Sequence, residues 1–162
     1  MKEIIFMLSF LMYAYTMTLS YAWGNSTTPS AVTVDELYTT TWKVQINQLA
    51  NNQQSPAKKA EATEKLASEY EATLEEMEEF KVHVLNEFLN LRYLSDGSNA
   101  EYMLGNMFQA IVLEHHDVPA VRDFAEAFYH NTKNVFTEVT EPESDLVQKY
   151  EEQMFKAINT KE

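Results

Sequence analysis

The chain lacks cysteine and is poor in glycine, proline and basic residues. Its 162 residues include no cysteine, 3 glycines and 4 prolines, and 12 Lys and Arg stand against 25 Asp and Glu. Without cysteine there can be no disulfide, no thiol catalysis and no cysteine-based zinc site. Because turn-forming residues are scarce, the sequence favours long helices whose stability comes from packed apolar surface.

The charge balance argues against polyanionic partners. A formal net charge of −13 repels nucleic acid and anionic lipid head groups, which bind to basic patches. The sequence also lacks a Gly-x-Ser-x-Gly motif, a glycine-rich phosphate loop and a His-Glu-x-x-His motif. We therefore expect a protein that is not an enzyme, needs no cofactor and has no nucleic-acid partner.

Residues 1–22 have the pattern of a secretory signal peptide. Lys2 gives a short basic start, residues 4–19 are mostly apolar, and the small residues Ser20 and Ala22 precede a cleavage site before Trp23. An uncut membrane anchor is the alternative, but the apolar run is shorter than the roughly 20 residues of a spanning helix. The sequence thus predicts a secreted protein, extracellular or periplasmic according to its source, with no stable membrane insertion after cleavage.

A polar, patternless segment follows the cleavage site. We interpret residues 23–32 as a flexible leader, and Asn25-Ser26-Thr27 within it as a candidate N-glycosylation site at Asn25. The remaining residues, 33–162, then form one domain, because their number suits a single hydrophobic core.

Apolar residues at helical spacing predict an all-α fold for this domain. Capping-box patterns, in which a Thr is followed by Glu three residues later, begin at Thr33 and again at Thr140. No glycine or proline lies between Pro56 and Gly97, so one long helix is expected over about 56–94, continuous or gently bent. The sequence predicts an antiparallel helical bundle of four to five helices, at about 34–50, 56–94, 99–116, 118–139 and 141–159.

The expected helix at 99–116 has little polar surface. Such a helix is either central in the bundle or covered by a partner, and the sequence leaves both alternatives open. Methionine and aromatic side chains suit adaptable binding surfaces. We therefore expect contact with a protein partner, or alternatively with a lipid or other apolar small molecule in an internal cavity, through six residues: Met103, Met107, Phe108, Val112, Phe124 and Phe128.

Histidines with a glutamate four residues away are the weak candidates for a metal site. The pairs are His83 with Glu87, and Glu126 with His130. Di-iron bundles instead use Glu-x-x-His twice, and that spacing is absent here. We expect no metal ion, with a metal-binding bundle as a distant alternative.

Overall fold

The computed structural model describes residues 41–160, which form six α-helices and no strand. The all-α class is confirmed, and the expected number of four to five helices is smaller than the six of this part of the chain. The predicted signal peptide (1–22), leader (23–32), glycosylation site (Asn25) and first turns of the 34–50 helix lie outside the described residues. The helices are α2 (Thr41–Asn51), α3 (Pro56–Ser68), α4 (Leu74–Leu89), α5 (Ala100–Leu113), α6 (Pro119–Phe136) and α7 (Asp145–Asn159).

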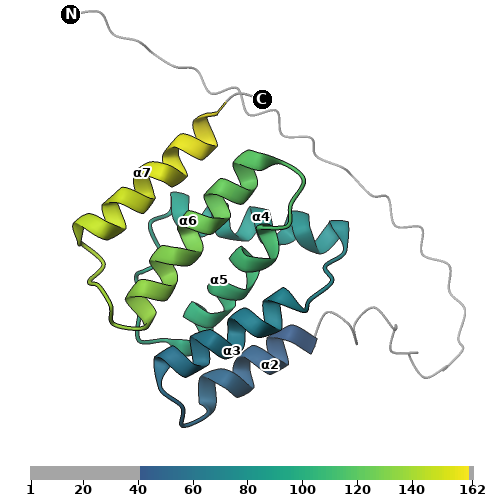
Figure 1. Cartoon of the computed structure of the whole chain (residues 1–162), viewed down its shortest axis with the longest axis vertical. Coiled ribbons are helices and arrows are strands. Elements are labelled where there is room, and N and C mark those ends of the chain that lie inside the picture. The colour runs from purple at the N-terminus through teal and green to yellow at the C-terminus, as the bar shows by residue number, and fades with distance from the viewer. Residues whose placement is uncertain (1–40, 161–162) are drawn as a thin grey trace, which may run out of the picture. The chain divides into compact units, whose positions relative to one another are not determined.

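Three consecutive helices lie side by side in alternating directions. Figure 1 shows α6 between α5 and α7, with α4 crossing behind α5 and α6, and the pair α2 and α3 beside α5. Helix α4 crosses its neighbours and does not run antiparallel to them. The antiparallel bundle expected over residues 33–162 therefore stays a prediction. Helix α5 packs against α2, α3, α4 and α6 and is the centre of the described fold.

The long helix predicted for residues 56–94 is wrong, because residues 69–73 separate α3 from α4. Thr73 begins α4 with a capping box. Its hydroxyl oxygen accepts a hydrogen bond from the Glu76 amide at 3.2 Å, and the Glu76 carboxylate accepts one from the Thr73 amide at 2.9 Å. The Tyr70 hydroxyl also donates to Glu76, at 2.5 Å. At the end of α3 the amides of Glu69 and Tyr70 donate to the Lys65 and Ala67 carbonyls at 3.2 Å, so this helix ends without glycine or proline.

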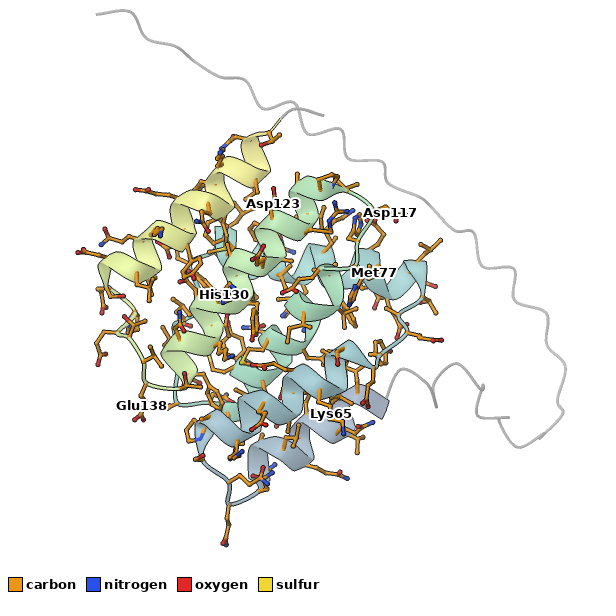
Figure 2. All side chains as sticks on the ribbon, viewed as in Figure 1. Lys65, Met77, Asp117, Asp123, His130 and Glu138 are labelled. Atoms are coloured by element: carbon orange, nitrogen blue, oxygen red, sulfur yellow. The ribbon has the colours of Figure 1, made fainter. Side chains whose placement is uncertain are left out.

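The break changes the position of Met77. The sequence places Met77 in the middle of a long helix, whereas the structure places it in the first turns of α4 (Figure 2). Its amide donates to the Thr73 carbonyl at 3.0 Å, which is one of the first hydrogen bonds of that helix. Proline at Met77 would therefore disturb a helix start and not the middle of a long helix.

Two helices end on residues other than glycine in a left-handed conformation. Leu91 after α4 has φ 53°, and Glu138 after α6 has φ 58°. The next amides, of Arg92 and Val139, donate back to carbonyls of the last helical turn at 2.9 Å. This Schellman-type ending usually contains glycine. Its use of Leu91 and Glu138 explains why the helices stop short of residues 94 and 139, where the sequence pattern puts them.

The last helix starts later than the sequence predicts. The expected capping box at Thr140 does not form; the Thr140 hydroxyl donates to the Ser144 hydroxyl at 2.6 Å instead. Ser144 is the N-cap of α7 and accepts from the Val147 amide at 3.3 Å. By contrast, Asn99 caps α5 and Pro119 occupies the first turn of α6, as their residue types favour.

Candidate functional site

The six apolar residues predicted to bind a partner all lie in the core. None of them exposes more than 3% of its surface. The Phe108 ring stacks on Trp42 with centroids 4.7 Å apart, and its edge contacts include Tyr70 and Phe80. The sequence left open whether the 99–116 helix is central in the fold or covered by a partner. The structure shows that it is central. Their contact with a partner stays a prediction, and of the six only Phe124 is among the lining residues of the grooves described below.

A surface groove of about 260 Å³ runs between α4, the start of α6 and the end of α7. The helix ends explain its apolar lining, because α6 begins with the small residues after Pro119 and α7 brings the apolar side of its last turn against them. We call it the apolar groove; it is lined by Lys81, Val84, Leu85, Val118, Ala120, Val121, Phe124, Ala157, Ile158 and Thr160.

Exposed apolar side chains continue this groove along α4 and α7. Leu89 lies one turn beyond Leu85 on the same side of α4 and is 60% exposed. On α7, Phe155 and Ile158 are three residues apart and are 48% and 40% exposed. The Phe155 ring rests against the buried Phe88 at 4.8 Å, which holds it in place at the surface.

A second groove, of about 400 Å³, lies between α6 and α7 and is polar. Asp123 and Glu126 line it from α6, together with His130, which lies two turns from Asp123 (Figure 2). Ala157 and Thr160 line both grooves, so the two grooves adjoin at the end of α7, and Lys156 of α7 lines the polar groove together with the two carboxylates. The apolar groove thus adjoins a polar groove that is lined by two carboxylates and one lysine.

Ion pairs fix the charges at the other side of the apolar groove. Lys81 pairs with Glu78 on the same helix, and the His116 Nε2 lies 3.6 Å from the other Glu78 oxygen. The hydrogen bond from Lys81 lowers the pKa of Glu78, which therefore stays ionised. Nearby, burial raises the pKa of the Glu114 carboxyl, with a further contribution from Glu126.

The two candidate metal pairs are engaged in other contacts. His83 Nε2 lies 2.9 Å from the Asn106 Oδ1, and the Glu87 carboxylate accepts a hydrogen bond from the Tyr102 hydroxyl. His130 stacks on Tyr150 at 5.3 Å and lies 3.9 Å from Glu126. Within residues 41–160 no three His, Asp or Glu side chains are grouped to hold a metal ion. The absence of a metal in the whole protein stays a prediction.

The comparisons with known proteins add no relative. No protein-family model, no curated protein and no solved structure matches this chain. Among the described helices, none is both long and apolar enough to cross a membrane.

Sequence reasoning missed the exposed part of the site, although a signal was present. Leu89 and Phe155 are exposed apolar residues that fall outside the core-facing stripes of their helices. An apolar residue that the core does not need is a better candidate for a surface contact than one inside the stripe.

Proposed function

We propose that this protein is exported and acts without catalysis, by binding the apolar face of a basic amphipathic helix of another protein. The apolar groove, extended by the exposed Leu89, Phe155 and Ile158, is the observation that carries the proposal. Helices commonly recognise one another in this way, with apolar side chains seated in a groove between helices.

The size and openness of the groove favour a protein over a lipid. Cavities that enclose small ligands measure about 300–1,000 Å³ and cover most of the ligand surface. This groove holds about 260 Å³ at the surface, with large apolar side chains left in solvent beside it. Side chains of a partner helix would fill the groove and cover Phe155 at the same time, whereas a carrier would enclose its ligand.

The charge beside the groove favours a basic partner. Asp123 and Glu126 outnumber Lys156 in the adjoining polar groove, and the chain as a whole carries a net charge of −13. A helix with apolar residues on one side and lysines on the other would meet apolar surface and carboxylates together.

A synthetic helix tests this proposal. The probe is a labelled peptide of about 18 residues with leucines on one face and lysines on the other, and fluorescence anisotropy gives its Kd. We expect Phe155→Asp to weaken binding by about tenfold or more, because it places a charge at an apolar contact. Val139→Asp adds the same charge at an exposed apolar residue that does not line the groove, and should have little effect.

Three results would contradict the proposal. Equal weakening by Phe155→Asp and Val139→Asp would show that general charge, not the groove, determines binding. If a matched peptide with glutamates in place of lysines binds equally tightly, the partner need not be basic, and that part of the proposal is wrong. Tight binding of a fluorescent fatty acid, with no binding of either peptide, would favour the carrier alternative.

Export is tested separately at the N-terminus. We expect mass spectrometry of the exported protein to find Trp23 as its first residue, because the small residues Ser20 and Ala22 follow the apolar run. An intact Met1 in a membrane fraction would instead indicate an uncut anchor.

A further inference from the structure

Helix α7 is attached to the rest of the described fold mainly on one side. It packs extensively against α6 alone, whereas each of the other described helices packs extensively against at least two neighbours. Figure 1 shows α7 at the edge of the arrangement. The buried residues of α7 are Val147, Met154 and Ala157. Few contacts outside the α6 surface would therefore break if α7 moved away as a unit.

The two grooves border the attachment of α7. The polar groove lies between α6 and α7 and reaches Tyr150 and Gln153 in the middle of α7. The apolar groove borders the last turn of α7, at Ala157 and Ile158. Because both grooves are open to solvent, water reaches the edges of the contact between α6 and α7, and the packed strip between them is narrow.

A buried amide weakens the contact between α6 and α7. Asn131 of α6 is fully buried, and its Nδ2 donates to the Val147 carbonyl of α7 and to the Tyr93 hydroxyl, both at 3.0 Å. Its Oδ1 makes no hydrogen bond within the described residues. A buried polar atom without a partner costs free energy. Water would satisfy this oxygen once α7 has moved away, so the amide favours separation of the two helices.

Two contacts hold α7 to residues outside α6. The Tyr93 hydroxyl donates to the Glu151 carboxylate at 2.9 Å, and the Phe155 ring lies 4.8 Å from the Phe88 ring. Phe155 is half exposed and Glu151 is partly exposed, so neither contact is closed off from solvent. Residues 137–144 join α6 to α7 and would keep an opened α7 tethered to the domain.

We propose that α7 opens as a unit while α2–α6 stay folded, and that this opening controls the apolar groove. Ala157, Ile158 and Thr160 line the groove at the end of α7, and the remaining lining residues come from α4 and from the start of α6. The groove is therefore complete only while α7 is closed. A partner helix that fills it holds α7 in place, a link that rests on the function proposed above.

Hydrogen exchange of backbone amides in the purified protein tests the opening, with Phe108→Leu as the decisive variant. Phe108 lies in α5, and the aromatic rings that it contacts are those of Trp42, Tyr70 and Phe80. The substitution therefore destabilises the closed and the α7-open states alike. We expect α5 amides to exchange about tenfold faster or more, because they exchange through complete unfolding, and α7 amides to exchange at an unchanged rate.

Met154→Ala is the matched variant in α7. Met154 is fully buried in the closed state, so its truncation should speed the exchange of α7 amides by about tenfold or more. If Phe108→Leu accelerates α7 and α5 amides equally, α7 opens only when the whole domain unfolds, and the proposal is wrong.

A measurement without substitutions addresses the same point. In urea below the unfolding transition, exchange of α5 amides should rise steeply and exchange of α7 amides only slightly, because opening of α7 exposes less surface than complete unfolding. The same urea dependence in both helices would also overturn the proposal.

The labelled leucine–lysine peptide tests the link to the apolar groove. At a free concentration of about one hundred times its Kd, the peptide should slow exchange of α7 amides about a hundredfold, because it binds only the closed state. Unchanged exchange of α7 with the peptide bound would overturn the link. If no peptide binds while Phe108→Leu still separates α5 from α7, the proposed function and the link both fail and the opening of α7 stands.

Discussion

The central helix α5 and the edge helix α7 use apolar residues in opposite ways. Ten of the fourteen residues of α5 are buried, among them Asn106 and Gln109, while only three of the fifteen residues of α7 are. Because α5 has neighbours on most sides, most of its apolar residues are buried in the core. Helix α7 packs on one side only, so Phe155 and Ile158 remain in solvent.

Apolar content alone does not locate a functional surface in a small helical protein. The helix with the most apolar residues attracts attention in the sequence, yet its residues explain stability. The amphipathic helices contribute the exposed apolar surface. The buried polar residues of α5, Asn106 and Gln109, differ from both groups. Burial of a polar side chain costs free energy unless the side chain forms hydrogen bonds, so packing of the core does not explain these residues.

The largest expected effect comes from a core aromatic residue of α5. Phe108→Ala should lower the free energy of unfolding by about 3–5 kcal/mol, because it removes a fully buried ring and leaves a cavity beside Trp42. Phe155→Ala is the matched change on α7 and should cost much less, about 1 kcal/mol, since that ring is half exposed. Urea unfolding measures both. Similar costs would erase the contrast between the two helices.

Proline substitutions test the break between α3 and α4. Val84→Pro, in the middle of α4, should cost about 3 kcal/mol or more, because proline removes a helical hydrogen bond and clashes with the preceding turn. Glu71→Pro should cost far less. The Glu71 amide donates to no atom of residues 41–160 and the side chain is exposed. Circular dichroism during thermal unfolding measures the stability of both variants. A large loss of stability in Glu71→Pro would indicate a continuous helix through residue 71.

Capping variants probe the same boundary with a smaller effect. Thr73→Ala should cost about 1 kcal/mol, because it leaves the Glu76 amide without its acceptor. Ser55→Ala, at the start of α3, is the control, since the Ser55 side chain makes no capping hydrogen bond. We expect its free energy of unfolding to change by about a few tenths of a kcal/mol at most. A larger loss at Ser55 than at Thr73 would contradict the assignment of the two caps.

The smallest effect concerns the contact of α6 with α3 at alkaline pH. The Tyr129 hydroxyl donates to Glu64 at 2.8 Å, and burial, with help from Glu64, raises its pKa to about 12. A pKa above the ordinary value of about 10 means that the folded state holds this proton more tightly. The resulting stability is complete below pH 10 and is lost as the pH rises from about 10 to 12. Tyr129→Phe should flatten that decline in urea unfolding series. An unchanged decline would rule out Tyr129 as its source.

Periodicity and caps allowed part of the fold to be predicted. Pro56, Asn99 and Pro119 mark helix starts that the structure confirms to within a residue. The prediction of one helix over 56–94 was wrong because it rested on the absence of glycine and proline in that range. The capping box of Thr73 and Glu76, which marks the start of α4, was not considered. The ends of α4 and α6 were mispredicted for a similar reason. Leu91 and Glu138 take left-handed conformations that are usually expected of glycine or asparagine.

Properties that depend on local chemistry follow from the sequence alone. Helical content follows from spacing and propensity, and the negative charge and the absence of disulfides follow from composition. The tertiary structure decided which apolar residues are core, because burial depends on how many neighbours a helix has. It made Phe108 a core residue and left Phe155 exposed, and it brought Gly105 and Asn106 of α5 beside His83 of α4, which spacing along one helix cannot reveal.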